Sequence, residues 1–300
     1  MTGSEPAQVA VVIPARDAAA FIGDALDSVL AQTASIGEIV VVDDGSSDET
    51  AHIVAGYGRG VRLLSQPPSG LPAARNAGVA ATSAPMIAFL DADDVWQPEC
   101  VQRLREHCEA NPDVGLVQCA VTVVDPALHP LQTLAHGVSG DPREAMLLPS
   151  VDRLYGGASG SLATRRAFDL VGGFDESMTH SEDWDFCYRV GGHCEVGFVP
   201  EALVLCRVHG GNMQRNVDAM RSNMLYAFDK AFADPEPQIR ALRRRAFGML
   251  HRKIAGSYLQ HRRYGKAVRH LTQAALLHPP ELFYALRLPQ RAMARRRGGR

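Results

Sequence analysis

Short apolar runs alternate with segments of helical periodicity over the first half of this chain. Runs of about four to eight apolar residues predict buried strands, and apolar residues three or four positions apart predict amphipathic helices. Strands that alternate with helices form βαβ units, so the pattern predicts an α/β fold with a mostly parallel sheet flanked by helices. The predicted strands are residues 8–14, 38–42, 61–64, 86–90 and 114–124, and the predicted helices are residues 18–32, 71–81 and 98–110, with one more beginning near Ser46.

Two of these helices carry start signals in the sequence. Asp17 stands directly before the first helical segment, where its side chain can act as an N-cap. Ser46 precedes Glu49 by three residues, which is the spacing of a capping box. We therefore expect helices to begin just after Asp17 and at Ser46.

The pattern changes after about residue 218, where the chain becomes helical and basic and the strand alternation stops. This change predicts one α/β domain over residues 1–218 and a helical C-terminal extension over residues 219–300. Proline, glycine and histidine are frequent between residues 127 and 152, which predicts a loop.

Charge is divided unevenly along the chain. Residues 1–239 carry 15 Lys and Arg against 32 Asp and Glu, a net charge of −17, whereas residues 240–300 carry 16 against one, a net charge of +15. An acidic body disfavours nucleic acid as a ligand, so we predict no nucleic-acid partner. The basic segment is open to several interpretations: contact with an anionic membrane, with an acidic partner or with the body itself, or a solvated helical face.

The six cysteines show no C-x-x-C spacing, which argues against a disulfide framework or a structural zinc site and favours a reducing, cytoplasmic environment. The apolar runs are much shorter than the roughly 18 residues that a membrane-spanning helix needs. The expected location is therefore the cytoplasm, and a peripheral position at the inner face of the membrane stays open.

Three carboxylates follow the predicted strand 86–90 within four residues, in the run Asp91-Ala92-Asp93-Asp94. Like charges this close are costly unless a cation or full exposure to water relieves the repulsion. Because side chains alternate along an extended segment, Asp91 and Asp93 can face one cation, and oxygen ligands favour Mg²⁺ or Mn²⁺. A solvated acidic turn is the simpler alternative.

Three further polar clusters accompany this run. Asp43-Asp44-Gly45 ends the predicted strand 38–42, where a carboxylate can accept from a ribose hydroxyl or a nucleobase N–H, although turn chemistry also explains it. Glu182-Asp183-Trp184 offers a carboxylate that can act as a general base, or the acidic first turn of a helix. Arg207 and His209 suit phosphate or metal contact, or a structural role.

In this order the clusters resemble the signature of the inverting glycosyltransferases of family two, which have the GT-A fold. The resemblance extends over about residues 8–215, and its pieces occur in the family's order. The residues that carry it are Val12–Arg16, Asp43–Ser46, Ala74–Gly78, Asp91–Asp94, Gly172–Glu176, Glu182–Asp183 and Arg207–His209.

The resemblance implies a fold, a reaction and a set of ligands. The fold would be a GT-A type, Rossmann-like sheet, and the reaction would move a sugar from a nucleoside diphosphate sugar, expected to be UDP-linked, to an acceptor hydroxyl by a single inverting displacement. The acceptor would be a glycan, a lipid-linked saccharide or another glycoconjugate. The implied nucleotide-binding residues are Pro14, Arg16, Asp43, Asp44, Arg75 and Asp91.

The resemblance also implies the metal and catalytic residues. Asp93 would contact a divalent cation, Mn²⁺ or Mg²⁺, and His209 would lie near the cation or the phosphates. Asp183 would be the general base that takes the acceptor proton, with Glu182 and Trp184 on the acceptor side.

Two other functions are compatible with parts of this pattern. A non-catalytic nucleotide-sugar-binding module, with the C-terminal extension as its interaction surface, would use the same nucleotide-binding residues. A nucleotidyltransferase would need a glycine-rich loop after the first strand, and Pro14-Ala15-Arg16-Asp17 has no glycine.

The C-terminal extension resembles half of a helical-repeat hairpin between Tyr264 and Pro280, and it mixes apolar and basic residues between Leu282 and Arg297. This composition leaves open a peripheral contact with an anionic membrane through the tail, and self-association into a homo-oligomer.

Overall fold

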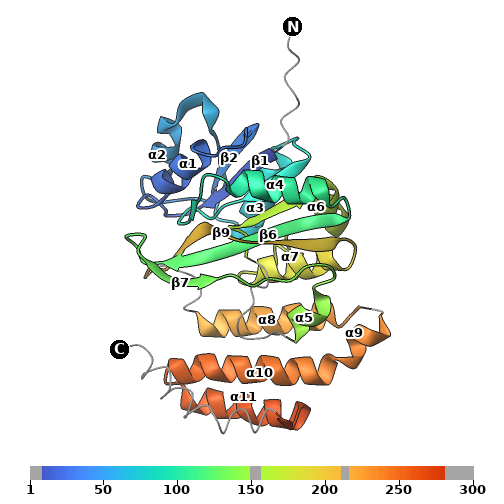
Figure 1. The fold of residues 1–300 in the computed structure, drawn as a ribbon. Coiled ribbons are helices and arrows are strands. Elements are labelled where there is room, and N and C mark those ends of the chain that lie inside the picture. The colour runs from blue at the N-terminus through green and yellow to red at the C-terminus, as the bar shows by residue number, and fades with distance from the viewer. Residues whose placement is uncertain (1–8, 149–156, 211–215, 235, 281–300) are drawn as a thin grey trace. The chain divides into compact units, whose positions relative to one another are not determined.

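The computed structural model describes residues 9–148, 157–210, 216–234 and 236–280. The chain divides into two compact units, residues 1–143 with 150–213 (unit 1) and residues 144–149 with 214–300 (unit 2). Within these described residues, unit 1 is built on a sheet of nine strands, and unit 2 is helical (Figure 1). The predicted membrane-contacting segment 282–297 lies outside the described residues.

The strand order of the sheet is β3-β2-β1-β4-β8-β6-β9-β5, and β7 pairs with β6. The first four of these strands are parallel. Strand β8 runs antiparallel to both of its neighbours, whereas β6 and β9 are parallel to each other. The strands are β1 (Val9–Ala15), β2 (Glu38–Asp43), β3 (Arg62–Ser65), β4 (Met86–Phe89), β5 (Val95–Trp96), β6 (Val114–Val124), β7 (Pro130–Leu134), β8 (Ser161–Thr164) and β9 (Glu195–Arg207).

Helices cover both faces of this sheet, which confirms the predicted α/β class. Every residue of β1 is buried, because a central strand between two helical layers has no solvent-facing side. Burying each Val or Ile side chain contributes about 1.5–3 kcal/mol. The helices of unit 1 are α1 (Ile22–Leu30), α2 (Thr50–Gly56), a single 3₁₀ turn η1 (Gly58–Gly60), α3 (Leu71–Ala80), α4 (Cys100–Ala110), α6 (Arg165–Val171) and α7 (Glu182–Gly191).

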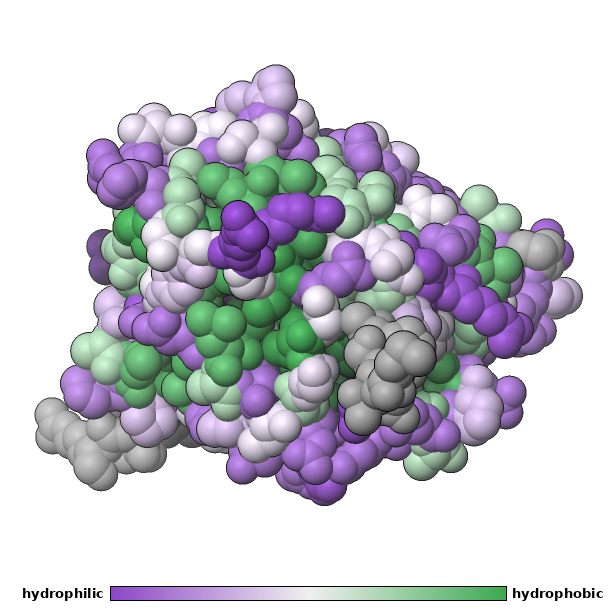
Figure 2. Space-filling model, turned by 90° about the horizontal axis from the view of Figure 1, so that it is seen from above, coloured by the Kyte–Doolittle hydropathy of each residue, from purple (hydrophilic) through white to green (hydrophobic). Residues whose placement is uncertain are grey.

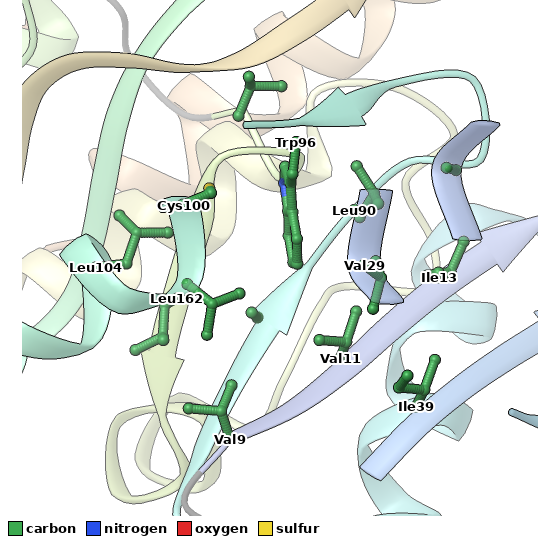
Figure 3. Packing of buried hydrophobic residues seen from close by; sticks show 14 of the residues in the cluster. Val9, Val11, Ile13, Val29, Ile39, Leu90, Trp96, Cys100, Leu104 and Leu162 are labelled. Atoms are coloured by element: carbon green, nitrogen blue, oxygen red, sulfur yellow. The ribbon is translucent and has the colours of Figure 1, made fainter. Parts of the chain in front are cut away.

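Alternate residues of β1 face opposite sides of the sheet. Val9, Val11 and Ile13 pack with residues of α1 and α4, such as Val29 and Leu104 (Figure 3). On the other face α3 approaches so closely that a Cβ at Gly78 would come within 2.3 Å of Val12 Cγ1. The glycine of the Ala-Arg-Asn-Ala-Gly segment is therefore required by helix–sheet packing.

Asp17 and Ser46, which were predicted to cap two helices, form other contacts in the structure. Helix α1 begins at Ile22, and Asp17 has a left-handed backbone with φ of 48°. Its Oδ1 accepts from Ser47 N at 2.7 Å, and its own N–H donates to Ser46 Oγ at 3.0 Å. Helix α2 begins at Thr50 without a side-chain cap. Both cap predictions were wrong, because these side chains tie the loops after β1 and β2 to each other.

Figure 2 shows one face of the molecule, on which hydrophobic residues form a central area bordered by hydrophilic residues. More than half of the accessible surface of ordinary folded proteins is apolar. Such an area therefore identifies no binding site without specific contacts.

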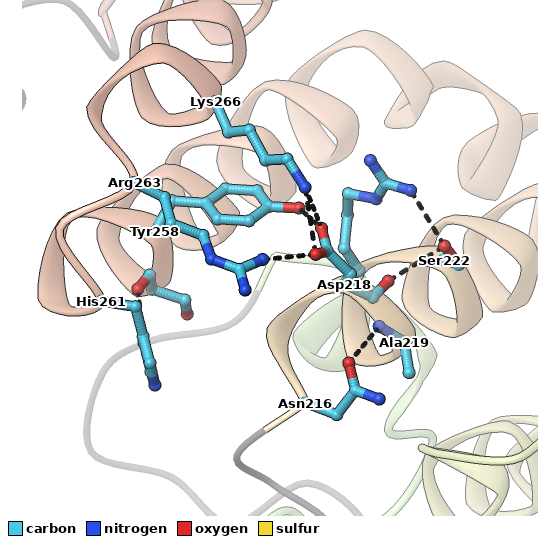
Figure 4. Close-up of polar contacts among 10 residues, drawn as sticks. Asn216, Asp218, Ala219, Ser222, Tyr258, His261, Arg263 and Lys266 are labelled. Carbon is cyan, nitrogen blue, oxygen red and sulfur yellow. Dashed lines mark hydrogen bonds and ion pairs between the residues drawn. The ribbon is translucent and has the colours of Figure 1, made fainter.

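Unit 2 is stabilised by helix packing and by polar contacts around Asp218. Asp218, in the first turn of α8, accepts from Tyr258 Oη at 2.5 Å and from Lys266 Nζ at 2.8 Å, and it also pairs with Arg263 (Figure 4). These partners lie in or next to α10 and α11, so one carboxylate joins three helices. The helices of unit 2 are α5 (Arg143–Leu147), which begins at the boundary of unit 1, α8 (Val217–Ala231), α9 (Pro237–Ala241), α10 (Arg243–Gln260) and α11 (Tyr264–Leu277).

Helices α10 and α11 form a tightly packed hairpin. A Cβ at Gly248 would come within 2.6 Å of His278 Cβ, and Ala267 and Ala274 are buried. Within the described parts of the chain, none of the helices combines the length and the hydropathy that crossing a bilayer requires.

Candidate active site

The polar clusters of the sequence meet at one edge of the sheet in unit 1. Ala15 and Asp43 are register partners at the ends of β1 and β2. Asp91 to Asp94 follow the end of β4, and Arg207 ends β9. In parallel α/β sheets, ligands bind beyond the carboxyl ends of the strands. The arrangement therefore fits a ligand site at this edge.

Arg75 joins two of the acidic clusters. Its Nη2 donates to Asp91 Oδ1 at 2.7 Å, and its Nη1 donates to Glu182 Oε1 at 2.6 Å. The side chain is only 2% exposed and lies over the ring of Phe174. Burial alone would lower the pKa of Arg75, but the carboxylates of Asp91 and Glu182 raise it above its usual value. The role of Arg75 as a nucleotide contact stays a prediction.

Asp183 follows Glu182 in the first turn of α7. Burial is the largest cause that raises the pKa of Asp183, to about 6, and the neighbouring Glu182 raises it further, while Arg75 lowers it. Ser181, which precedes the helix, has a left-handed backbone with φ of 61°. A non-glycine residue in this conformation is uncommon and often marks a functional site. A carboxylate with this pKa is suited to proton transfer near neutral pH.

Asp93 and His209 lie together at the same edge. His209 Nε2 is 2.9 Å from Asp93 Oδ2, and both side chains are partly exposed. Burial and the negative charge of Asp91 raise the pKa of Asp93. A bound cation would offset the cost of ionising Asp93, and the imidazole of His209 offers a second donor atom beside it.

Asp94 has a different environment from its neighbour. It is 4% exposed, and its Oδ1 accepts from the backbone N–H of Arg207 at 2.8 Å. Burial, followed by the charges of Asp91 and Asp93, raises the pKa of Asp94 to about 8. Asp94 therefore connects β4 to β9, which brings His209 toward Asp93.

Asp93 and His209 are suited to bind a divalent cation together with the phosphates of a substrate. Among the residues that the structure describes, no group of three or more His, Cys, Asp and Glu side chains is arranged to hold a metal ion by itself. Mg²⁺ and similar ions are commonly held by one or two carboxylates together with substrate phosphates. Asp93 and His209 can supply the protein part of such a set.

Asp43 hydrogen bonds within its own loop, whereas Asp44 joins this loop to the segment before α3. Asp44 uses both oxygens, since Oδ1 accepts from Ser69 N at 2.7 Å and Oδ2 accepts from Gly70 N at 2.9 Å. Asp43 Oδ1 accepts from Ser46 N at 3.1 Å, and no hydrogen bond from a described residue reaches Asp43 Oδ2. Asp43 therefore has the greater capacity to accept from a ligand.

The remaining predicted residues are less closely connected to these clusters. Pro14 pairs with Val42 inside the sheet, and Arg16 is exposed at the end of β1. Trp184 is buried and stacks on Tyr188, with ring centroids 5.4 Å apart. The ligand roles of Pro14, Arg16 and Trp184 stay predictions.

The site also contains Ser159, which the sequence did not single out, and contacts of Arg207 that the sequence did not predict. Ser159 accepts from the backbone N–H of Asp91 at 2.9 Å, and it hydrogen bonds the carboxyl of Asp94. Arg207 pairs with Asp24 at 2.8 Å and lies over Phe21, whose ring packs on His209. Only long-range packing reveals these contacts, because Ser159 lies 68 positions from Asp91 in the sequence, and Arg207 lies 183 positions from Asp24.

The Gly172–Glu176 motif has a structural explanation. Asn76 Oδ1 accepts from Phe174 N at 2.9 Å, and Asn76 Nδ2 donates to the carbonyl of Phe174. Gly173 has φ of 74°, and a Cβ there would come within 2.7 Å of Asn76 Oδ1. The motif therefore attaches the loop before α7 to α3, the helix that carries Arg75.

A cavity of about 910 Å³ lies at the opposite edge of the sheet, lined by residues that include Met86, Val114, Thr164 and Glu195. These residues begin β4, β6 and β9 and end β8. None of the predicted site residues lines it, so this cavity is separate from the acidic edge.

Solved structures share this fold over most of the chain. The mannosyltransferase PcManGT of Pyrobaculum calidifontis, solved with GDP-Man and Mn²⁺, superposes with a TM-score of 0.65 at 18% identity over 97% of this chain and 84% of its own. Residues 1–349 of S. aureus TarS, solved with UDP-GlcNAc, give a TM-score of 0.60 at 13% identity over 91% of this chain and 92% of their own. The fold is therefore the GT-A fold of glycosyltransferases.

Sequence comparisons identify the family. The model of glycosyl transferase family 2 matches residues 10–165. An uncharacterized glycosyltransferase of Rickettsia prowazekii is 30% identical over 205 residues, which cover 67% of this chain and 64% of the relative. Chondroitin synthase of Pasteurella multocida is 27% identical over 72% of this chain and 22% of its own length. This chain belongs to glycosyl transferase family 2, and it spans about 64% of the length of the first curated relatives.

Proposed function

We propose that this protein is an inverting glycosyltransferase that moves a sugar from a nucleoside diphosphate sugar to an acceptor hydroxyl. The observation that carries the proposal is the link through Arg75, which holds Asp91 on one side and Glu182, next to Asp183, on the other. A carboxylate for the donor side and a base for the acceptor side are thereby fixed around one reaction centre.

In the proposed reaction Asp183 accepts the proton of the acceptor hydroxyl. The acceptor oxygen then forms a bond to the anomeric carbon of the sugar, on the face opposite the diphosphate. The bond between this carbon and the phosphate oxygen breaks, and the nucleoside diphosphate leaves with the electron pair. A single displacement of this kind inverts the anomeric configuration. The raised pKa of Asp183, about 6, allows the base to be ionised at neutral pH and still bind a proton well.

Asp93 and His209 would hold a divalent cation, Mn²⁺ or Mg²⁺. When bound, such an ion neutralises the negative charge that develops on the leaving diphosphate. Asp43, with one oxygen available, would accept from the base or the ribose of the nucleotide. Both assignments rest on the chemistry of the donor atoms and on their location at the acidic edge.

We further propose a UDP-linked donor and an acceptor that is a glycan, a lipid-linked saccharide or another glycoconjugate. Two similar proteins support this proposal. S. aureus TarS was solved with UDP-GlcNAc, and the relative from P. multocida is a chondroitin synthase. PcManGT was solved with GDP-Man, so a guanosine donor is the competing choice. The catalytic domain would be residues 1–218, and residues 219–300 would be its helical extension.

Two substitutions separate catalysis from binding. In Asp183→Asn we expect transfer to fall by at least about a hundredfold, because the base is lost, while nucleotide affinity stays unchanged. In Asp93→Ala we expect the Mn²⁺-dependent part of nucleotide binding to disappear together with transfer. Calorimetric titration with UDP and GDP, with and without Mn²⁺, and a product assay measure these effects.

The control is Asp113→Asn, an exposed carboxylate at the opposite edge of the sheet, which should leave both properties unchanged. Near-normal transfer by Asp183→Asn would rule out Asp183 as the base. Tight nucleotide binding by the wild type without transfer or donor hydrolysis over a broad acceptor panel would favour the non-catalytic binding module.

A further inference from the structure

Helix α11 of unit 2 has an outer face that combines apolar and basic residues. Its inner face is buried against α10 through Ala267, His270 and Ala274. On the other side Tyr264 and Val268 are each 62% exposed and Leu276 is 71% exposed. Val268 follows Tyr264 by four residues and precedes Leu276 by eight, so with 3.6 residues per turn the three side chains spread over an arc of about 120° of the helix surface.

Basic residues outnumber acidic residues around this face. Residues 237–280 contain ten Lys and Arg and no Asp or Glu. Part of this charge is balanced by α8, because Asp218 pairs with Arg263 and Lys266. Arg262 and Arg269 are exposed and form no ion pair with a described residue. The outer face of α11 therefore keeps positive charge next to exposed apolar side chains.

We propose that the outer face of α11 binds the surface of an anionic lipid bilayer. A helix that lies in the membrane interface inserts apolar side chains between the lipids while its basic residues contact anionic headgroups. Val268, Leu276 and Arg269 provide these two kinds of contact within three turns of one helix. The charge of this face is complementary to an anionic membrane.

Two other partners fit this face less well. A second copy of the chain would bring like charges together, which opposes association through the same face. Nucleic acid would be attracted by the arginines, but its phosphate backbone would leave the exposed aliphatic side chains of Val268 and Leu276 without an apolar partner. A lipid surface satisfies both the charge and the apolar side chains.

Co-sedimentation of the full chain with lipid vesicles tests the proposal. We expect binding to vesicles of phosphatidylcholine with phosphatidylglycerol, little binding to phosphatidylcholine alone, and loss of binding at high salt, where charges are screened. Val268→Ser combined with Leu276→Ser should weaken binding at least tenfold. Arg269→Gln should weaken it roughly fivefold, since each basic residue near such a surface contributes about 1 kcal/mol.

Matched controls come from unit 1, where Leu170 on α6 and Arg59 on η1 are also exposed. Leu170→Ser and Arg59→Gln should leave vesicle binding unchanged. Circular dichroism verifies that the α11 variants fold, which is expected because the substituted side chains are exposed.

Three results would overturn the proposal. The first is equal vesicle binding by the wild type and the α11 variants. The second is a wild-type protein that does not bind anionic vesicles but binds a single-stranded oligonucleotide, with this binding weakened by Arg269→Gln. The third is a concentration-dependent dimer, disrupted by the Val268 and Leu276 substitutions, without any binding to vesicles. None of these measurements depends on glycosyl transfer, so failure of the proposed enzymatic function leaves the test intact.

Discussion

At the scale of single residues, the protonation of Asp183 should control the pH dependence of transfer. Its pKa is raised to about 6, and the base must be ionised to accept a proton. We therefore expect kcat/KM to be constant at higher pH and to fall about tenfold per pH unit as the pH drops below about 6. A pH profile measured with donor and acceptor held below their KM values tests this expectation.

A profile without an inflection between pH 5 and about 7 would contradict the assignment of Asp183 as the base. The control is Asp113→Asn, whose profile should match that of the wild type, because this exposed carboxylate lies at the other edge of the sheet.

The same raised pKa has a consequence for stability. A carboxyl group with a higher pKa in the folded than in the unfolded state binds its proton more tightly when folded, so ionisation destabilises the fold as the pH rises from about 4 to above 6. Asp183→Asn removes this effect. We expect the variant to be more stable than the wild type at pH 8 by up to about 3 kcal/mol, since one pKa unit corresponds to about 1.4 kcal/mol.

Urea unfolding at pH 8 and at pH 4 measures this difference. The advantage of Asp183→Asn should vanish at the lower pH, where both side chains are neutral. A variant that is less stable than the wild type at pH 8 would contradict the expected effect of burial on the carboxylate.

Arg75 and Arg103 provide a matched comparison of buried and exposed ion pairs. Each contacts two carboxylates, but the side chain of Arg75 is 2% exposed and that of Arg103 is 44% exposed. Arg75→Met leaves Asp91 and Glu182 without their partner, which should cost about 3–5 kcal/mol of unfolding free energy. Arg103→Met should cost about 0–1 kcal/mol. If urea unfolding gave similar losses of unfolding free energy for Arg75→Met and Arg103→Met, the ion pairs of Arg75 would be screened by water as much as those of Arg103.

At the scale of elements, alanine substitutions at two glycines test how closely helix α3 packs on strand β1. A Cβ at Gly78 would come within 2.3 Å of Val12 Cγ1, whereas a Cβ at Gly56, at the end of α2, would meet nothing within 4 Å. Gly78→Ala should lower the unfolding free energy by about 1–3 kcal/mol through overpacking. Gly56→Ala should raise it by about 0.5–1 kcal/mol, because alanine favours helix.

Chemical denaturation of both variants gives the two changes. A Gly78→Ala protein as stable as the wild type would show that α3 can shift away from β1 without loss of packing.

The strands and helices that could be predicted are those that a pattern of neighbouring residues in the sequence defines. The predicted strands at residues 8–14 and 86–90 are mostly apolar, and β1 (Val9–Ala15) and β4 (Met86–Phe89) match them to within one residue at each end. The helix starts at Asp17 and Ser46 could not be predicted, because these residues bond to each other across two loops that are 29 positions apart. Strand β8 was missed for a similar reason, since only its antiparallel pairing with β4 and β6 defines it.

The candidate site shows the same distinction. Asp91, Asp93 and Asp183 carry recognisable chemistry in the sequence. The contacts of Ser159 and Arg207 with this site depend on which strands are neighbours, and the sequence does not encode this locally.

At the scale of the whole molecule, ligand binding should be visible as a stability change. A ligand that binds the native state adds about 2.7 kcal/mol at a concentration of 100 times its Kd. We expect the nucleoside diphosphate of the correct base, together with Mn²⁺, to raise the melting temperature more than the other bases do. A thermal-shift panel of UDP, GDP, ADP and CDP with and without Mn²⁺ identifies it.

Asp93→Ala is the control in this panel, because it should lose the additional effect of Mn²⁺. A panel in which no nucleoside diphosphate shifts the wild type would contradict the proposed donor class.

The two ion pairs of Arg75 hold Asp91 and the first turn of α7 at a fixed separation in the absence of any ligand. Asp91 and the first turn of α7 are anchored to the same buried guanidinium, so neither can move without breaking an ion pair. In the proposed reaction, Arg75 would therefore keep the carboxylate of the donor side and the first turn of α7, which carries the proposed base, at a constant separation throughout the catalytic cycle.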